Sequence, residues 1–271
     1  MDALPNQPFS MVPLPSERQR KPRGSGLTMM IDWGLPYQRV RDQLETVAPY
    51  IDLVKIAVGT ARLYQEEQLV KKLALYKSHG VRPFLGGQFG EYVFATQGQR
   101  AMEPFYAEAK RVGFDAVEVS DNCVPLGEAE REHLIRKAIG SGLEVHGEVG
   151  SKLEQQSAST LIAQANLCLD AGCHVVLVEG AELVEGGRPK RELIRALREE
   201  LDLSKVLLEL TGPWIEGAGL AEVYRLKKFL IGEFGANVNL ANVMPDDVLE
   251  TEALRVGLSV IGPKREAGEA R

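Results

Sequence analysis

Short apolar segments rich in β-branched residues recur along this chain, and most of them end in a polar or acidic residue before an amphipathic helical stretch. The eight segments are Leu27–Asp32, Ile51–Lys55, Val81–Gly86, Ala116–Ser120, Leu143–Glu148, Val175–Glu179, Val206–Glu209 and Val238–Leu240. Their ends are spaced by roughly 30 residues, which is the length of one strand–loop–helix unit. Eight such units close a (β/α)8 barrel, in which the carboxyl ends of the strands meet at one site. The pattern therefore predicts a single-domain α/β protein of the (β/α)8 TIM-barrel class.

The residues between these segments carry ordinary helix boundaries. Pro36 stands at a helix-start position, and glycines that suit the left-handed conformation after a helix precede several of the segments. These glycines are Gly80, Gly113, Gly142 and Gly172. An open doubly wound sheet is the main alternative, but its GxGxxG phosphate-binding turn is missing after the first segment, which ends Ile31-Asp32-Trp33-Gly34. The closed barrel is therefore preferred.

Length and local composition divide the chain into one domain and two short ends. A barrel needs about 250 residues, and the chain has 271. Residues 1–24 hold five prolines and a basic patch, Arg18 to Arg23, and we expect a flexible N-terminal arm there. An arm that packs on a neighbouring subunit is the alternative. Residues 25–262 form the predicted barrel, and 263–271 form a frayed tail.

Composition indicates which classes of binding partner and which cellular compartment to expect. The net charge of −6 gives no electrostatic footprint for nucleic acid, although a local site could still bind small anions. No apolar run reaches the ~18 residues that span a bilayer, so no membrane association is expected. The three cysteines are an odd number without metal-type spacing. A cytoplasmic protein in a reducing environment is the natural interpretation.

Acidic residues gather at the predicted strand ends, where barrel closure would bring them together. We expect these carboxylates to be metal ligands: Asp32, Glu118, Glu148, Glu179 and Glu209. An unpaired buried carboxylate costs several kcal/mol, so such residues must be paired, solvated or bound to a cation. A ring of salt bridges is one reading. A hard divalent cation such as Mg²⁺, which takes oxygen ligands, is the reading preferred for the set.

Two lysines are candidates for proton transfer. Lys55 ends an otherwise apolar segment, where it either points into the mouth or pairs with a neighbouring carboxylate. Lys152 follows the fifth segment, and Gly150 allows the backbone to turn over the mouth so that the lysine reaches the centre. Among carboxylates Lys152 would stay protonated and act as a general acid. No HExxH or GxSxG pattern is present, so neither a zinc site nor an α/β-hydrolase is expected.

From Lys21 to about Leu258 the sequence resembles the phosphosulfolactate synthase family of coenzyme M biosynthesis. The matching stretches are Lys21–Arg23 with Leu27–Gly34, Tyr50–Lys55 with Gly59-Thr60, Gly86-Gly87 with Glu91, Gly113–Asp121, Glu148–Lys152, Asp170–Gly172, Val178-Glu179 and Asn237–Asn242. Each is short, but their order and spacing are specific. The resemblance implies a (β/α)8 barrel that adds sulfite to phosphoenolpyruvate with Mg²⁺ to give (2R)-phospho-3-sulfolactate. It also implies that Lys152 is the general acid and that the protein forms a homo-oligomer, a trimer or tetramer.

The substrate-contacting residues follow from the strand ends and from these motifs. We expect the substrate anions to contact Gly87, Gln88, Ser120, Arg188, Asn239 and Asn242. Several of the loops depart from the family pattern. The family carries an arginine after the sixth segment, where this chain has Ala181, and Arg188 is the expected replacement. The loop after the seventh segment reads Leu208–Trp214 in place of the family's Phe-Glu-Ala-Pro.

These departures leave two alternatives to sulfite addition. The first is a relative on the same scaffold that uses another nucleophile, such as a thiol, or another enol or acrylate acceptor. The second is a non-catalytic, stress-related barrel like the plant heat-stress branch of the family. That branch lacks the Ile-Asp-x-Gly end of the first segment, and Asp32 and Gly34 argue against placing this chain in it.

Overall fold

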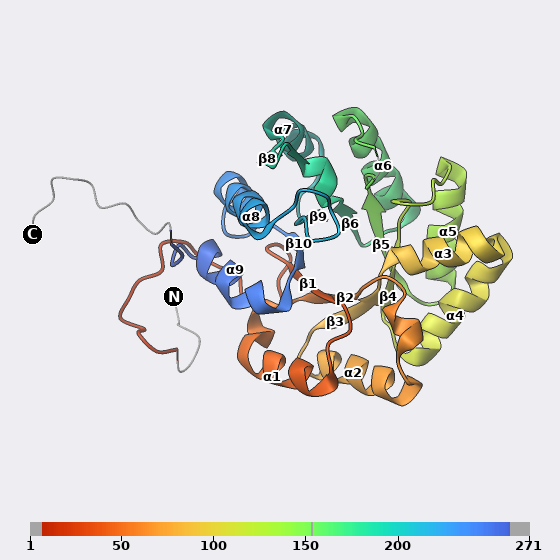
Figure 1. Ribbon diagram of the computed structural model, residues 1–271, viewed down its shortest axis with the longest axis horizontal. Helices are drawn as coiled ribbons and strands as arrows, with labels where there is room; N and C mark the ends of the chain where they lie inside the picture. Colours follow the sequence, from red (N-terminus) through yellow and green to blue (C-terminus); the bar gives the residue numbers. More distant parts are fainter. Residues whose placement is uncertain (1–6, 153, 261–271) are drawn as a thin grey trace, which may run out of the picture.

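The computed structural model describes residues 7–152 and 154–260, and in them eight parallel strands close into a barrel (Figure 1). The barrel strands are β1 (Thr28–Asp32), β2 (Leu53–Ile56), β3 (Arg82–Leu85), β4 (Ala116–Val119), β5 (Glu144–Val149), β6 (Val175–Val178), β9 (Val206–Glu209) and β10 (Leu240–Val243). Strands that are consecutive among these eight pair with each other, and β10 pairs with β1 to complete the ring. The predicted fold class is therefore confirmed.

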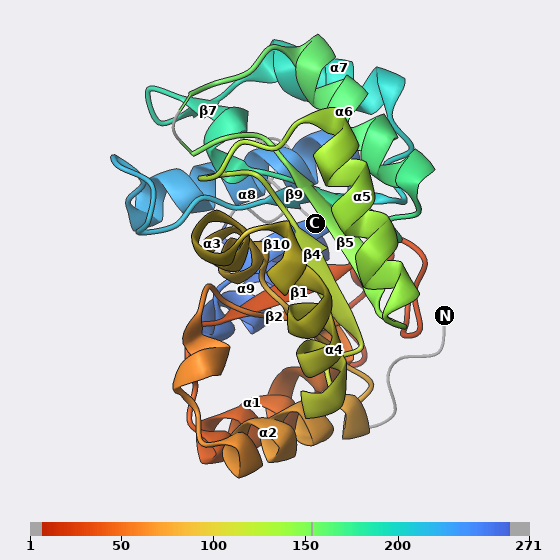
Figure 2. The ribbon, with the colours of Figure 1, turned by 90° about the vertical axis from the view of Figure 1, so that its right-hand side faces the viewer.

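Helices connect the strands and cover the barrel from outside. They are α1 (Tyr37–Val47), α2 (Glu66–Ser78), α3 (Gly87–Gln97), α4 (Met102–Val112), α5 (Glu128–Gly140), α6 (Ala158–Ala171), α7 (Arg191–Glu200), α8 (Leu220–Phe234) and α9 (Val248–Arg255). Figure 2 shows α1 and α2 on one side of the strands and α6 and α7 on the other. Among the described residues, no helix is long and apolar enough to cross a membrane.

Two connections are more elaborate than one helix per strand. Both α3 and α4 follow β3, because the chain turns at Gly98, whose φ is 77°. After β6 comes a short 3-10 helix, η4 (Gly180–Leu183), and a hairpin of β7 (Val184–Glu185) and β8 (Arg188–Pro189). Both additions lie after the carboxyl ends of strands, where loops of this fold build the active site.

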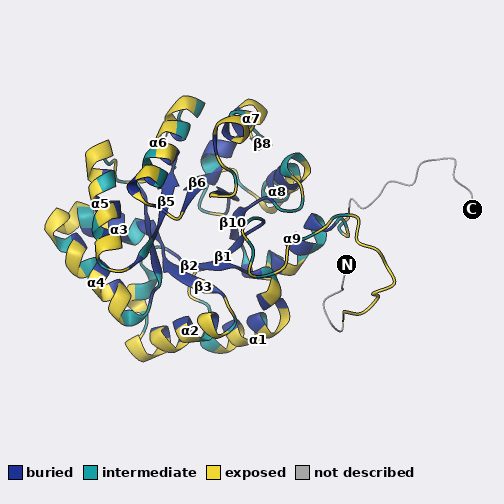
Figure 3. Ribbon diagram, turned by 180° about the vertical axis from the view of Figure 1, so that it is seen from behind, coloured by how far each residue is buried: buried dark blue, intermediate teal, exposed yellow. Residues whose placement is uncertain are grey.

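The apolar residues form two separate clusters. The larger cluster fills the layer between strands and helices, so the strands are buried and the outer helix faces exposed (Figure 3). The smaller cluster fills the barrel interior and comprises Leu27, Met29, Leu53, Phe84, Ala116, Val175, Leu177, Leu207 and Ala241. Packed side chains close the centre of such a barrel, so it is not a pore.

The alternation of side chains along the strands places charged residues in the layer above the smaller apolar cluster. Successive side chains on a strand point to opposite faces, so a residue two positions after an interior residue also points inward. Leu53, Ala116 and Leu207 belong to the interior cluster, and Lys55, Glu118 and Glu209 follow each of them by two positions. Barrel closure therefore gathers these ionisable groups at the carboxyl end of the strands.

The basic patch before β1 packs against the amino end of the same barrel. Arg18 pairs with Glu252 at 3.1 Å and donates to Asn237, while Arg23 lies 3.5 Å from Asp52. Lys21 donates to the carbonyl oxygens of Ala48 and Ile51. The prediction that residues 1–24 form one flexible arm is thus corrected for this patch, because its cations bind acceptors on the barrel floor. The predicted tail 263–271 lies outside the described residues.

Candidate active site

Three buried glutamates meet at the mouth of the barrel. Glu118 is the last residue but one of β4, Glu148 lies on β5 and Glu209 ends β9, and each side chain is almost fully buried. One carboxylate oxygen of each lies within 4.8 Å of the corresponding oxygens of the other two. Three carboxylates this close repel one another, so the arrangement requires positive charge at its centre.

Lys55 supplies part of that charge. Its Nζ lies 2.8 Å from Glu118, 2.8 Å from Glu209 and 3.9 Å from Glu148. Burial lowers the pKa of this ammonium, but the three carboxylates outweigh burial and raise it well above its usual value. Lys55 is therefore a fixed cation in the metal-free protein, and it combines both orientations expected from the sequence.

Lys152 enters the cluster from the loop after β5. Its Nζ lies 2.6 Å from Glu179 and 3.6 Å from Glu148, and it also donates to Oδ1 of Asn122. Burial again lowers the pKa, and the facing carboxylates of Glu148 and Glu179 raise it above the ordinary value. The ammonium is thus protonated at neutral pH, as a general acid must be.

The carboxylates divide into ionised and protonated forms. Burial would raise the pKa of Glu148, but Lys55 and Lys152 outweigh it and hold that pKa at about 2. Glu209 is less well compensated, and burial raises its pKa to about 8. Burial and the charge of Glu148 also raise the pKa of Glu118. The metal-free site therefore retains a proton at neutral pH that an incoming cation would displace.

The residues present fit a hard divalent cation. Glu118, Glu148 and Glu209 offer only oxygen donors, which suit Mg²⁺. Oδ1 of Asn242, on the wall of the same cavity, is buried and accepts no hydrogen bond from the described residues. Buried polar atoms are normally satisfied, so this oxygen indicates a further partner at the site. The buried acidic triad could hold a metal ion.

A cavity of about 170 Å³ opens above the triad. It is lined by Ile31, Trp33, Lys55, Ala57, Val58, Gly86, Gly87, Gln88, Glu118, Glu148, Lys152, Glu209, Trp214 and Asn242. The indole rings of Trp33 and Trp214 lie 5.3 Å apart at its rim. No arginine is among these lining residues of the described chain. The cavity thus joins a charged floor to an aromatic rim.

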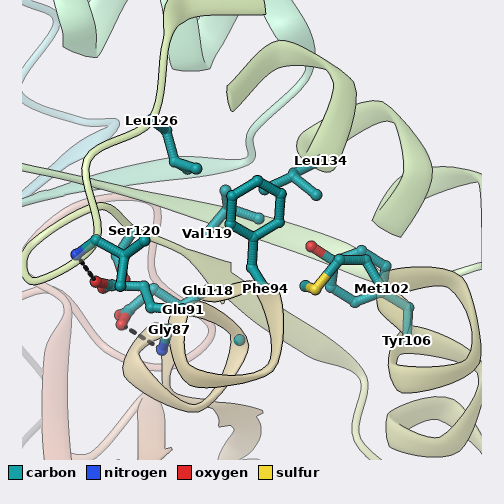
Figure 4. Close-up of a pocket in the computed structure, with 12 residues that line it drawn as sticks. Gly87, Glu91, Phe94, Met102, Tyr106, Glu118, Val119, Ser120, Leu126 and Leu134 are labelled. Atoms are coloured by element: carbon teal, nitrogen blue, oxygen red, sulfur yellow. Dashed lines mark hydrogen bonds between the residues drawn. The ribbon is translucent and has the colours of Figure 1, made fainter. Parts of the chain in front are cut away.

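A smaller crevice lies beside the cavity, beneath α3 (Figure 4). Glu118 accepts a hydrogen bond from the backbone N–H of Gly87 at 2.8 Å, so the first turn of α3 fixes that carboxylate. A Cβ at position 87 would lie 3.0 Å from the Glu118 carboxylate and 2.9 Å from Cβ of Ser120. Gly87 therefore allows α3 to approach β4 closely. Gly87 also lies on the wall of the larger cavity, and its contact with a substrate anion stays a prediction.

Four predicted site residues lie elsewhere and require correction. The Asp32 carboxylate binds Lys72, Tyr76 and the backbone of Gly34 and Leu35, so it faces the helix layer. Ser120 donates to Glu91 rather than facing the cavity.

The other two corrections concern Asn239 and Arg188. The last strand begins only at Leu240, so Asn239 precedes it and binds Leu27, Leu203 and Val206 at the barrel floor. Arg188 is exposed on the β7–β8 hairpin and does not line the cavity, so it does not replace the arginine expected at position 181.

The structure brings together Lys55, Lys152, Glu118, Glu148, Glu179 and Glu209, with Gly87, Gln88 and Asn242 on the cavity wall. Their catalytic and binding roles stay predictions. Sequence reasoning missed Trp33 and Asn122. Both follow a predicted strand end by one or two positions, so extending each end by two residues would have found them.

Comparison with known proteins identifies a family. Residues 16–260 match the family model of (2R)-phospho-3-sulfolactate synthase (ComA). The chain is 32% identical over 244 residues to a phosphosulfolactate synthase of Methanocaldococcus jannaschii, covering 86% of this chain and 92% of that protein. It is 22% identical over 270 residues to HEAT-STRESS-ASSOCIATED 32 of Arabidopsis thaliana, covering 88% of each.

Solved structures resemble the chain in fold. A truncated 3-deoxy-D-arabino-heptulosonate 7-phosphate synthase from Thermotoga maritima superimposes with a TM-score of 0.53 at 12% identity, covering 80% of this chain and 74% of that chain. At this identity the likeness concerns the barrel alone.

Proposed function

The chain belongs to the (2R)-phospho-3-sulfolactate synthase family, and from that premise we propose that it is a Mg²⁺-dependent carbon–sulfur lyase. It adds sulfite to phosphoenolpyruvate and forms (2R)-phospho-3-sulfolactate. The observation that carries this proposal is the meeting of three buried carboxylates and the protonated Lys152 at one cavity. An electron-rich addition intermediate needs both a cation and a proton donor, and this mouth offers a place for each.

The reaction balances with the groups at this site. The sulfur lone pair of sulfite forms a bond to C3, and the C2–C3 π electrons move toward the substrate carboxylate. Bound Mg²⁺ would neutralise the charge that develops on that carboxylate. Lys152 then donates its Nζ proton to C2, while Glu148 and Glu179 keep its ammonium oriented. Lys55 holds the acidic floor together and faces the same cavity.

The test is a direct assay. The protein is incubated with phosphoenolpyruvate, sulfite and Mg²⁺, and phosphosulfolactate is measured by mass spectrometry. We expect product that disappears when Mg²⁺ is chelated. The Lys152→Ala variant serves as the matched control for the protein sample. A folded protein that forms no product over a broad range of pH and reactant concentration would reject the proposal.

A second reaction on the same scaffold is favoured by the cavity wall. Phosphoenolpyruvate and sulfite together carry several negative charges, yet the lining holds three glutamates against two lysines and no arginine. The Trp33–Trp214 pair offers an apolar surface instead. A less charged nucleophile, such as an organic thiol, or another enol or acrylate acceptor would suit this rim. Pairing each nucleophile with each acceptor in one screen separates the two reactions.

We further propose that the protein works as a cytoplasmic homo-oligomer, a trimer or tetramer. Its Cys123, Cys168 and Cys173 are free thiols, which suit a reducing compartment. Phe9, Met11 and Leu14 are exposed in the segment before β1, where contact with another subunit would cover them. Light scattering after size-exclusion chromatography tests the assembly. A single monomeric species at micromolar concentration would contradict it.

A further inference from the structure

A buried glutamate on α3 holds the loop after β4 from beneath. Glu91 accepts hydrogen bonds from the hydroxyl of Ser120 and from the backbone N–H groups of Asn122 at 3.2 Å, Cys123 at 2.8 Å and Val124 at 2.9 Å. Figure 4 shows its carboxylate between α3 and that loop. Both oxygens are used, and every donor lies on one five-residue stretch. These hydrogen bonds to Glu91 fix the backbone of the loop.

Asn122 connects this loop to the proton donor. Its backbone N–H binds Glu91, its Oδ1 accepts from Nζ of Lys152, and its Nδ2 donates to the carbonyl of Gly150 at 3.1 Å. The side chain is almost fully buried. Asn122 therefore spans the two loops that follow β4 and β5, and any shift of its backbone would move the acceptor that holds the Lys152 ammonium.

A second buried glutamate holds the loop of Lys152 from the other side. Glu182 on η4 accepts from the backbone N–H groups of Ser151 at 3.0 Å and Gln156 at 2.9 Å. Gly150, with φ of 103°, approaches it so closely that a Cβ there would lie 2.7 Å from Cγ of Glu182. Glu179, the residue just before η4, contacts Lys152 directly. The loop is thus pinned at both of its ends.

We propose that Glu91 and Glu182 are positioning residues for Lys152: Glu91 acts through Asn122, and Glu182 acts through the backbone on either side of the lysine. A lysine side chain has a flexible four-carbon stem and loses rotamer entropy when it is fixed. A proton donor displaced by about 1 Å can lose on the order of 100-fold in rate. The hydrogen bonds of these two carboxylates go to the loops that hold Asn122 and Lys152, and they serve that geometric need. The kinetic part of this inference rests on the proposed function, in which Lys152 donates the proton.

The kinetic test uses variants that keep side-chain size. In Glu91→Gln and in Glu182→Gln an amide NH₂ replaces one accepting oxygen and faces a backbone donor. We expect kcat to fall about 10–100-fold with KM within about threefold, because an interaction that acts at the proton-transfer step is lost. Asp52→Asn is the control. Asp52 is a buried carboxylate that accepts from the backbone of Thr28 at the barrel floor, far from Lys152, and its replacement should leave kcat unchanged.

A double-mutant cycle tests the route through Asn122. Asn122→Ala removes the contact to Lys152 but leaves the backbone N–H that Glu91 accepts. If Glu91 acts through Asn122, the two changes share one effect, and the double variant should be little slower than the worse single variant. Multiplication of the two effects would show that Glu91 does not act through Asn122, and it would overturn that part of the proposal.

A second readout needs no knowledge of the reaction. An amine-acylating reagent is added, and its rate at Lys152 is followed by peptide mass spectrometry in the metal-free protein. Glu91→Gln, Glu182→Gln and Asn122→Ala should each raise the rate at Lys152 several-fold, while the rate at Lys137 on α5 and the Asp52→Asn control stay at the parent level. If the three variants are labelled faster but the parent shows no activity with sulfite, the proposed function is rejected and the positioning roles stand. Unchanged labelling in all three variants would overturn the positioning roles.

Discussion

Replacing Lys55 with methionine distinguishes two interpretations of the carboxylate cluster, a metal-binding site and a ring of salt bridges. Methionine keeps the apolar stem and removes the charge that lies 2.8 Å from both Glu118 and Glu209. Removal of one partner from a buried ion pair costs about 3–5 kcal/mol. For a chain of this size each kcal/mol lowers the unfolding midpoint by about 2–4 °C, so the metal-free variant should melt about 6–20 °C below the parent.

A divalent cation should restore much of this loss. Mg²⁺ at about 100 times its dissociation constant stabilises the folded state by about 2.7 kcal/mol, or roughly 5–11 °C. The rise in unfolding midpoint caused by Mg²⁺ should be larger in Lys55→Met than in the parent, because the cation then also replaces the missing ammonium. Lys72→Met is the control. Lys72 is equally buried, but it pairs with Asp32 outside the acidic triad, so Mg²⁺ should not rescue that variant more than the parent.

The pH dependence gives the same experiment a second check. Without Lys55, the buried carboxylates have raised pKa values, so the folded state binds more protons than the unfolded state. Stability is then retained at low pH and lost as pH rises through those pKa values. The deficit of Lys55→Met should therefore be larger at pH 8 than at pH 5.5. Differential scanning calorimetry measures both quantities. A midpoint within about 2 °C of the parent at pH 8, or an equal Mg²⁺ gain in both proteins, would refute the reasoning.

Three further predictions concern single residues. Lys152→Ala should lower turnover by about 10²–10⁴-fold, the usual worth of a general acid, while circular dichroism stays native; near-normal turnover would remove Lys152 from the mechanism. Because burial raises the pKa of Glu209 to about 8, Mg²⁺ must displace its proton, and affinity measured by calorimetry should rise up to tenfold per pH unit below 8. Glu209→Gln should flatten that slope, and a parent affinity independent of pH would count against Glu209 as a ligand. Burial in the barrel interior lowers the pKa of His146, so the unfolded state takes up its proton first and stability falls as pH drops below 6.5, by at most about 1.4 kcal/mol per unit. His146→Gln should remove this acid-side loss in urea titrations, and an unchanged slope would assign it to other groups.

Much of the barrel follows from local sequence pattern. The run Val206–Glu209 is reproduced as β9 without any change of boundary, and most other strands begin or end within two residues of their predicted limits. The reason is that strand alternation and helix periodicity are both local properties. The eighth strand was placed two residues too early, because Asn237–Asn242 offers asparagines at both ends of a short apolar core.

The site was harder to predict, because its contacts join residues far apart in the chain. Lys55 and Glu209 are separated by 154 positions, and no local pattern indicates that they pair. Asp32 is the last residue of β1, whereas Glu118 is the last but one of β4. The Asp32 carboxylate binds Lys72 and Tyr76 of α2 in the helix layer. The direction of a side chain at a strand end depends on parity along the strand. A one-residue difference therefore moves a carboxylate from the mouth to the outer layer.

The apolar side chains of Phe84, Leu177 and Leu207 pack in the barrel interior beneath the acidic cluster and close its centre there. We therefore expect reactants to enter and product to leave through the mouth of the cavity, which Trp33 and Trp214 line. Product must then be released through this mouth before a reactant can bind at the acidic cluster. Accumulated product should accordingly compete with both reactants. Replacing Trp33 or Trp214 with a smaller residue should speed product release more than it changes the rate of bond formation.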